Sequence, residues 1–328
     1  MTVLVTGGAG YIGSHMVLEL LDSGETPVVL DNLSTGFRSA VPDGVPLVIG
    51  DFGDEALIDR IAAEHKISAI IHFAARIVVP ESVSDPLGYY LNNTAKARSL
   101  IASAVRNTIR HFIFSSTAAV YGNPKANPVS ESEPLSPVSP YGRSKLMVEW
   151  MLEDASKAHD FRHVVLRYFN VAGADPKGRA GQSTHDATHL IKVAVQAALG
   201  RRKGMEVFGA DYPTPDGSCL RDYIQVTDLA RAHRDALRYL RAGGDSLTCN
   251  CGYQKGYSVL EVIDVVKSVS GVDFPVTLSG RRAGDPAAIV ASNALARAVL
   301  GWQPQHDDLA AIVRQALNWE RRLHNQVE

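Results

Sequence analysis

The sequence lacks the residue patterns that mark several common classes of protein. It has only three cysteines, Cys219, Cys249 and Cys251, which are too few for a disulfide framework and lack metal-ligand spacing. Its eleven histidines form no metal motif, and no apolar run approaches the ~18 residues of a membrane-spanning helix. The N-terminus has no charged stretch followed by an apolar one, so we see no signal peptide. We expect a soluble cytoplasmic protein with reduced cysteines, no metal and no membrane contact.

The charge of the chain is nearly balanced. Lysine and arginine total 33, aspartate and glutamate total 35, and the net charge is −2. Because there is no basic excess and no basic tail, we expect no nucleic-acid partner. The chain of 328 residues can bury a large core, and this length corresponds to roughly one and a half to two domains.

The first residues have the pattern of a dinucleotide-binding turn. An apolar run, Val3 to Val5, precedes three glycines, Gly7, Gly10 and Gly13, and a helix is expected over residues 11–23. Such glycines allow a tight turn, close approach to a pyrophosphate, and packing of helix on strand. A second apolar strand ends in Asp31, whose carboxylate would accept hydrogen bonds from the ribose hydroxyls and repel a 2′-phosphate. The sequence therefore predicts NAD rather than NADP.

Strands and helices alternate in the first half of the chain, which predicts a doubly wound, Rossmann-like parallel sheet. We expect an NAD-binding domain over residues 1–170 and a smaller, mixed C-terminal substrate lobe over 171–328, with some exchange of chain between them. The two lobes should share a cleft. The expected strands are 2–6, 27–31, 46–50, 69–74, 111–115 and 163–168. The expected helices are 11–23, 54–65, 86–107, 140–159, 184–200, 227–241, 258–270 and 307–323.

A tyrosine and a lysine four residues apart carry the predicted chemistry. Tyr141 and Lys145 follow Pro140, which suits the first turn of a helix, so both side chains should lie on one face. A nearby ammonium and an oxidised nicotinamide favour the phenolate, which would make Tyr141 a base. Ser115 and Thr117 follow an apolar strand and could bond a substrate oxygen and the phenol. In isolation, the same spacing could be a surface tyrosine beside a solvated lysine.

Several motifs together resemble the extended short-chain dehydrogenases/reductases and, within them, the UDP-glucose 4-epimerase family along essentially the whole chain. The motifs are Thr6-Gly7-Gly8-Ala9-Gly10-Tyr11-Ile12-Gly13, Asp31-Asn32-Leu33-Ser34, Ile71-His72-Phe73-Ala74-Ala75, Tyr141-Gly142-Arg143-Ser144-Lys145, Arg167-Tyr168-Phe169-Asn170, Phe208-Gly209-Ala210-Asp211-Tyr212, Arg221-Asp222-Tyr223 and Arg281-Arg282-Ala283-Gly284-Asp285.

The resemblance implies roles for individual residues. Tyr141 matches the base, Lys145 the lysine beside it, and Thr117 the hydroxyl that bonds the sugar. The matches to NAD contacts are Gly7, Gly10, Tyr11, Ile12, Asp31, Asn32, Asp51, Phe52, Phe73, Ala74, Ala75, Asn92, Ser115, Tyr141, Lys145 and Tyr168. The matches to UDP-sugar contacts are Thr117, Tyr141, Phe169, Asn170, His189, Leu190, Phe208, Arg221, Arg282, Asp285 and Ile289. Arg221 and Arg282 could also pair with Asp222 or Asp285.

The reaction that the resemblance implies is NAD-dependent interconversion of UDP-glucose and UDP-galactose, performed by a homodimer. Three positions depart from the family pattern, Ile77, Thr188-His189 and Ile289, and each lies where cofactor or sugar would be bound. An epimerase of UDP-pentoses, UDP-uronates or UDP-N-acetylhexosamines therefore stays open. A 4,6-dehydratase is disfavoured because Ala118 and Ala119 stand where an Asp-Glu pair would be needed. A non-enzymatic NAD-binding regulator is disfavoured by the intact Thr117, Tyr141 and Lys145.

Overall fold

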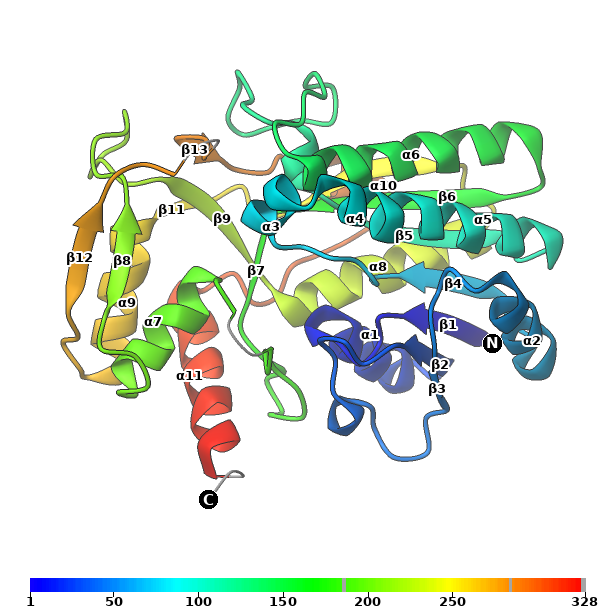
Figure 1. The fold of residues 1–328 in the computed structure, drawn as a ribbon, viewed down its shortest axis with the longest axis horizontal. Helices are drawn as coiled ribbons and strands as arrows, with labels where there is room; N and C mark the ends of the chain where they lie inside the picture. The colour runs from blue at the N-terminus through cyan, green and yellow to red at the C-terminus, as the bar shows by residue number, and fades with distance from the viewer. Residues whose placement is uncertain (185–186, 283–284, 326–328) are drawn as a thin grey trace.

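A seven-stranded parallel sheet forms the centre of the larger lobe in the computed structural model, which describes residues 1–184, 187–282 and 285–325 (Figure 1). The strand order is β10-β6-β5-β4-β1-β2-β3, so the order reverses beside β1, where doubly wound folds bind their ligands. The strands are β1 (Thr2–Thr6), β2 (Thr26–Asp31), β3 (Leu47–Ile49), β4 (Ala69–His72), β5 (His111–Thr117), β6 (Arg162–Tyr168) and β10 (Leu247–Cys251).

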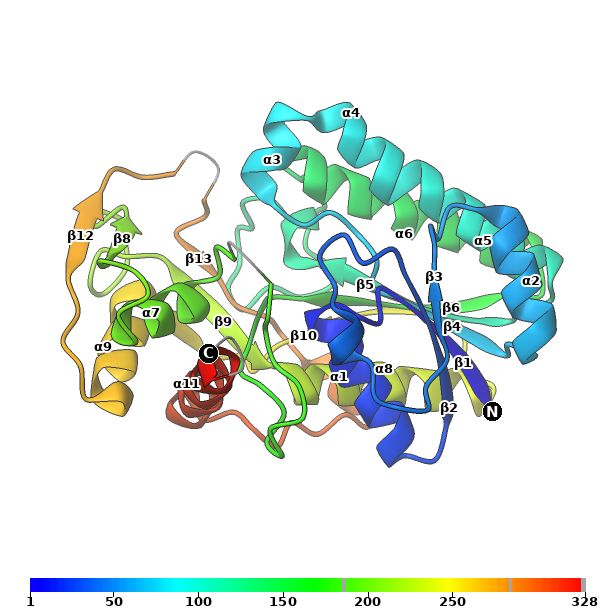
Figure 2. The same ribbon diagram turned by 60° about the horizontal axis from the view of Figure 1, so that its bottom comes forward.

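Helices cover both faces of this sheet, as Figure 2 shows. One face buries an apolar cluster under α1 (Tyr11–Asp22), α8 (Val226–Arg241) and α10 (Ala294–Leu300). The other face packs against α2 (Glu55–His65), α5 (Lys96–Arg106) and α6 (Pro140–Ala158). Burial on both faces explains why the strands are apolar along their whole length. The shorter elements of this lobe are η1 (Arg38–Ala40), α3 (Val79–Ser84), α4 (Pro86–Tyr89), the π-helical turn η2 (Tyr90–Ala95) and η3 (Ala118–Val120).

The smaller lobe has two small sheets packed on three helices. In one sheet, β9 (Leu220–Gln225) pairs with β11 (Gly256–Ser258), β13 (Ala288–Ile289) and β7 (Asn170–Ala172). In the other, β8 (Met205–Phe208) pairs with β12 (Val276–Ser279). A separate apolar cluster joins the helices α7 (Leu190–Ala198), α9 (Val259–Ser270) and α11 (Leu309–Asn325).

Local sequence signals account for where several helices begin. The side chain of Asp54 accepts a hydrogen bond from the Leu57 amide at the start of α2, and Ser139 does the same for Gly142 at the start of α6. Ser258 and Glu261 form a reciprocal capping box at the start of α9. In the described part of the chain, no helix has the length and apolar character needed to cross a bilayer.

The predicted fold class is confirmed, and the structure corrects the sequence prediction at three places. The edge strand β10 was not predicted, and it comes from the half of the chain assigned to the smaller lobe, as does α8. The helix expected over 86–107 is interrupted by the wider turn η2. The helix expected over 184–200 begins only at Leu190, after an extended segment, and residues 185–186 lie outside the described residues.

Candidate active site

The glycine turn between β1 and α1 has no room for side chains. Gly7 has a φ of +73°, and a Cβ at Gly13 would lie 2.1 Å from the Gly7 carbonyl oxygen. Helix α1 begins after Gly10 without a side-chain cap, and no acidic residue lies in its first turn. The free N–H groups and the positive end of the helix dipole therefore suit an anionic group such as a pyrophosphate.

Asp31 ends the neighbouring strand β2 with its carboxylate held in place. Its Oδ2 accepts a hydrogen bond of 3.0 Å from the amide of Ala9, and its Oδ1 accepts one of 2.8 Å from the amide of Leu33. The first bond fixes the carboxylate to the glycine turn. A carboxylate oxygen can accept more than one hydrogen bond, so Asp31 can also bind ribose hydroxyls.

The other residues matched to NAD contacts lie at the same edge of the sheet. Phe73, Ala74 and Ala75 follow β4, Ser115 lies near the end of β5, and Tyr168 ends β6. Asp51 and Phe52 follow β3. There Asp51 pairs with Lys96 and Phe52 packs 4.9 Å from the His72 ring. Asn92 lies in η2 and donates a 3.0 Å hydrogen bond to Asn93. Most of these residues thus lie at or beside the carboxyl ends of the parallel strands, the edge at which such sheets bind ligands.

Tyr141, Lys145 and Thr117 meet beside this edge. Tyr141 and Lys145 lie on the buried face of α6, and Tyr141 is 8% exposed while Lys145 is 3% exposed. Lys145 Nζ donates a 2.8 Å hydrogen bond to the carbonyl oxygen of Ser115 and lies 4.7 Å from the centre of the Phe114 ring. The Thr117 hydroxyl lies close enough to the Tyr141 hydroxyl to favour its ionised form. The structure thus brings together the three residues that the sequence singled out.

Burial controls the protonation of this pair. Removal from water raises the pKa of the Tyr141 hydroxyl, and the hydrogen bond with Thr117 opposes this rise. Burial also lowers the pKa of Lys145 to about 7, and the negative charge of Glu149 opposes that fall. The net direction at Tyr141 is a raised pKa.

Several residues matched to UDP-sugar contacts lie on or beside the small sheets of the second lobe. Arg221 on β9 lies opposite Ile289 on β13, and its Nη2 is 3.6 Å from Asp285 Oδ1. The Arg282 guanidinium lies 3.7 Å from the centre of the Phe208 ring. Arg221 thus lies near Asp285, one of the two partners foreseen from the sequence, whereas Arg282 stacks on Phe208. Asp222 accepts backbone hydrogen bonds instead of pairing with Arg221.

Ile289 belongs to an apolar group at the end of the sheet next to the Tyr141 helix. It is 6% exposed and is clustered with Phe169, Leu146 and Val129. Leu146 directly follows Lys145 in α6. The position predicted to border the sugar is therefore packed near the predicted base.

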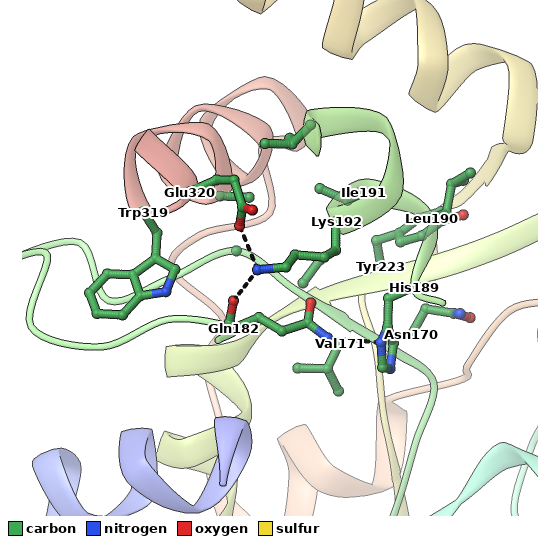
Figure 3. A pocket seen from close by; sticks show the side chains of 14 residues that line it. Asn170, Val171, Gln182, His189, Leu190, Ile191, Lys192, Tyr223, Trp319 and Glu320 are labelled. Carbon is green, nitrogen blue, oxygen red and sulfur yellow. Dashed lines mark hydrogen bonds and ion pairs between the residues drawn. The ribbon is translucent and has the colours of Figure 1, made fainter. Parts of the chain in front are cut away.

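A small cavity of about 20 Å³ is lined in part by the remaining residues that were matched to UDP-sugar contacts (Figure 3). Asn170, His189 and Leu190 line it, and Leu190 begins α7. His189 Nδ1 is hydrogen-bonded to the Gln182 side chain at 2.8 Å, and burial lowers the pKa of His189, so this imidazole is neutral. His189 is therefore an uncharged hydrogen-bonding group in the wall of this cavity.

The sequence analysis missed the buried ion pair that holds this wall together. Lys192 Nζ donates 2.5 and 2.6 Å hydrogen bonds to Glu320 Oε2 and to the Gln182 carbonyl oxygen (Figure 3). Arg201 also donates to Glu320, at 2.5 Å. These residues tie α7 and the Gln182 segment to the C-terminal helix α11. No sequence motif marks the pairing, because its partners are 128 residues apart.

Comparison with known proteins gives one consistent result. The model of the NAD dependent epimerase/dehydratase family matches residues 3–252. The UDP-glucose 4-epimerase of Azospirillum brasilense is 56% identical over 325 residues, which are 99% of this chain and 93% of that protein. The structure of UDP-glucose 4-epimerase from Brucella ovis in complex with NAD superposes with a TM-score of 0.94 at 45% identity, covering 97% of each chain. That of Bifidobacterium longum, in complex with NAD+ and UDP, has a TM-score of 0.94 at 37% identity and 99% coverage of each chain.

Proposed function

The chain belongs to the NAD dependent epimerase/dehydratase family, and from this premise we propose that it interconverts UDP-glucose and UDP-galactose by inversion at C4 of the sugar. The observation that carries the proposal is the meeting of Tyr141, Lys145 and Thr117 at the edge of the sheet where the glycine turn lies. Epimerases of this name that are similar over nearly the whole length support the choice of substrate.

The residues at the sheet edge fit NAD. The crowded glycine turn, the uncapped start of α1 and the fixed carboxylate of Asp31 suit the pyrophosphate and the adenosine ribose. Lys145 would hold the ribose next to the nicotinamide and Tyr168 would border it. NAD, when bound, supplies the redox chemistry by accepting the C4 hydrogen with its electron pair and returning it to the opposite face of the sugar.

The chain's own residues perform the proton transfer and hold the sugar. Tyr141 removes the proton of the 4-hydroxyl as C4 becomes a ketone, and it returns that proton when C4 is reduced again. Thr117 hydrogen-bonds the same oxygen and keeps it beside the phenol. The keto sugar must rotate in the site between the two halves of the reaction. The protein must therefore bind the sugar weakly and UDP strongly. Arg221 and Arg282 provide positive charge for the diphosphate.

The experiment that tests this function is a comparison of four substrates. The pure protein is incubated separately with UDP-galactose, UDP-N-acetylglucosamine, UDP-xylose and UDP-glucuronate, and the products are separated. We expect UDP-galactose to be converted to UDP-glucose most efficiently. Efficient conversion of only one of the other three would replace the glucose/galactose assignment with that sugar class, while conversion of none would overturn the proposed activity.

Bound NAD should accompany the protein through purification. A cofactor that is regenerated within each turnover has no need to exchange, and the glycine turn and Asp31 can hold it tightly. Denaturing the pure protein and assaying the supernatant should release NAD close to one per chain. A protein that emerges empty and depends strictly on added NAD for activity would contradict this expectation.

We also propose a homodimer formed through the outer surface of α5 and α6. A groove of about 420 Å³ lies there, lined by Ile101, Val105 and Met151 among others, and Trp150 beside it is 54% exposed. Leu100 and Ala104 of α5 do not contribute to this surface, because both are fully buried against the sheet. The exposed apolar side chains suit a second copy of the same surface.

Light scattering at micromolar concentration should therefore give about twice the chain mass of 35.4 kDa. Trp150→Glu should shift the mass toward one chain, because a charge would be buried in the apolar contact. Lys177→Glu, at an exposed position beside Asp22 of α1 and away from α5 and α6, serves as the control and should leave the dimer intact. A wild-type protein that is monomeric under these conditions would remove the dimer proposal. A cytoplasmic location stays a prediction, in keeping with three buried free thiols.

Ile289 should control which sugars are accepted. We expect Ile289→Tyr to suppress activity on UDP-N-acetylglucosamine and to leave hexose activity largely intact, whereas Ile289→Ala should do the reverse. Size discrimination by an apolar pocket is about 10- to 200-fold per methylene-scale change. The control is Val290→Ala, because Val290 directly follows this strand and its side chain lies against Gly256. If neither Ile289 variant alters the ratio of the two activities, Ile289 does not border the sugar.

A further inference from the structure

Two residues of α6 attach the same helix to consecutive residues of β5. Lys145 donates to the Ser115 carbonyl oxygen at 2.8 Å, and Glu149, one turn later, accepts a hydrogen bond from the Ser116 hydroxyl. Lys145 and Glu149 are 3% and 6% exposed. Residues four apart lie on one face of a helix, with Cβ atoms about 5–6 Å from each other. The carboxylate of Glu149 is therefore a buried negative charge one helical turn from Lys145.

A row of polar side chains across the sheet holds this carboxylate. Ser116 on β5 lies in register with Arg167 on β6, and Arg167 lies in register with Asn250 on β10. Arg167 binds Glu149 through Nε at 3.1 Å and Nη2 at 2.6 Å. Its Nη1 donates to the Tyr121 hydroxyl at 3.0 Å, and Tyr121 donates to Asn250 Oδ1 at 2.7 Å. We name Ser116, Glu149, Arg167, Tyr121 and Asn250 the polar row.

Stability alone does not explain why the ion pair of Glu149 and Arg167 is buried. The side chains of Glu149 and Arg167 are each 6% exposed, and taking two charges out of water costs about as much as their attraction returns. Apolar residues of similar volume would serve the packing equally well. What they could not provide is a negative charge, fixed in direction, next to the buried ammonium of Lys145.

The surroundings offer Lys145 little other negative charge. His72 and His233 are buried, and burial lowers the pKa of both imidazoles, so they are neutral. The titratable and charged groups that face Lys145 and Glu149 from the packed elements are Tyr141 on α6, His72 on β4, Arg167 and Tyr168 on β6, His233 on α8, and Tyr121 with Glu131 in the segment after β5. Of these only Glu131 can carry a negative charge near neutral pH, and it bonds the amide of Asn250.

We propose that Glu149 is a positioning residue for the reaction. The other members of the polar row hold its carboxylate in place, and the carboxylate keeps Lys145 charged and directed at the cofactor and Tyr141. This inference rests on the proposed function, because it gives Lys145 a task only if Tyr141 and Lys145 act together. Glu149 itself touches neither substrate nor cofactor in this account. It acts through Lys145.

The direction of the effect follows from the charges. The charge of Glu149 opposes the fall that burial causes in the pKa of Lys145, so its removal should lower that pKa further. Lys145 would then lose its proton at a lower pH, and with it the positive charge that favours the Tyr141 phenolate. The alkaline side of the pH–turnover profile should move to lower pH. Loss of the positive charge of Arg167 should move the Lys145 pKa the opposite way.

The test measures the titration of Lys145 directly in the full-length holoenzyme. Lysines labelled with carbon-13 at Cε are titrated by nuclear magnetic resonance, and Lys145→Arg identifies the signal. In Glu149→Gln the pKa of Lys145 should fall by about one unit, and turnover of UDP-galactose at alkaline pH should fall more than at neutral pH. In Arg167→Met the pKa of Lys145 should rise. The control is Glu19→Gln, which removes a carboxylate paired with Arg234 between α1 and α8 and should leave the Lys145 titration unchanged.

The opposite shifts separate positioning from a merely structural role, which would change the folded fraction of both variants in the same direction. If Glu149→Gln does not fold, the Arg167→Met titration decides alone. An unchanged Lys145 pKa in the variants that fold would overturn the inference, as would shifts of the same sign in both. Because the titration needs no substrate, failure of the wild-type protein to convert any UDP-sugar would sink the proposed function without affecting this result.

Discussion

Tyr141→Phe is expected to lose most of the turnover of UDP-galactose while its binding of UDP stays near that of the wild type. The variant keeps the ring that packs at the site and removes only the hydroxyl that accepts the proton. Proton transfer by a positioned side chain contributes about 10²–10⁴-fold, and kcat should fall by that factor. Steady-state kinetics gives the loss, and calorimetry with UDP gives the binding.

Two comparisons make this result specific to the base. Thr117→Ala should lose less, because Thr117 orients the oxygen and carries no net proton. Tyr239→Phe, which alters a partly buried tyrosine on α8 packed against the core on the other face of the sheet, should keep full activity. Wild-type turnover in Tyr141→Phe would show that another group removes the proton.

Glu320→Ala is expected to cause the largest loss of stability of the substitutions considered. It removes the one carboxylate that binds both Lys192 and Arg201, and the side chains of Lys192 and Glu320 are 6% and 3% exposed. Removal of one partner of a buried pair costs about 3–5 kcal/mol, because the other charge is left buried without compensation. Thermal unfolding of the protein should show a markedly lower midpoint.

The matched control for this prediction is Glu153→Ala. Glu153 pairs with Lys157 on the surface of α6, where both side chains are more than half exposed, and exposed pairs add little to stability. The unfolding midpoint of Glu153→Ala should match that of the wild type. A Glu320→Ala protein as stable as this control would mean that the Lys192 ion pair does not hold α7 to α11.

The parts of the fold and site that could be predicted are those determined by residues close together in the sequence. The apolar run before Gly7 and the acid at the end of β2 follow one another within 31 residues, so their spacing alone indicates a dinucleotide turn. Tyr141 and Lys145 belong to one helix, and Pro140 and Ser139 mark where it begins. In each case the residues that determine the local structure lie in one short segment of the sequence.

The parts that were not predictable depend on contacts between distant segments. Strand β10 alternates buried cysteines with Thr248 and Asn250, so it lacks the continuous apolar run typical of a strand buried on both faces. Asn250 is polar because Tyr121, 129 residues earlier, donates to it. The ion pairs of Glu149 with Arg167 and of Lys192 with Glu320 also join different elements. Nothing in local periodicity shows which buried charges will meet.

The most direct test of the central claim is incubation of UDP-galactose with the purified protein in heavy water, without added NAD. The account predicts UDP-glucose that keeps its original hydrogen at C4, because the C4 hydrogen is removed and returned inside the closed site while only the hydroxyl proton exchanges with solvent. Nuclear magnetic resonance of the product reads this position directly. Deuterium at C4 of the UDP-glucose, or no UDP-glucose at all, would contradict the account.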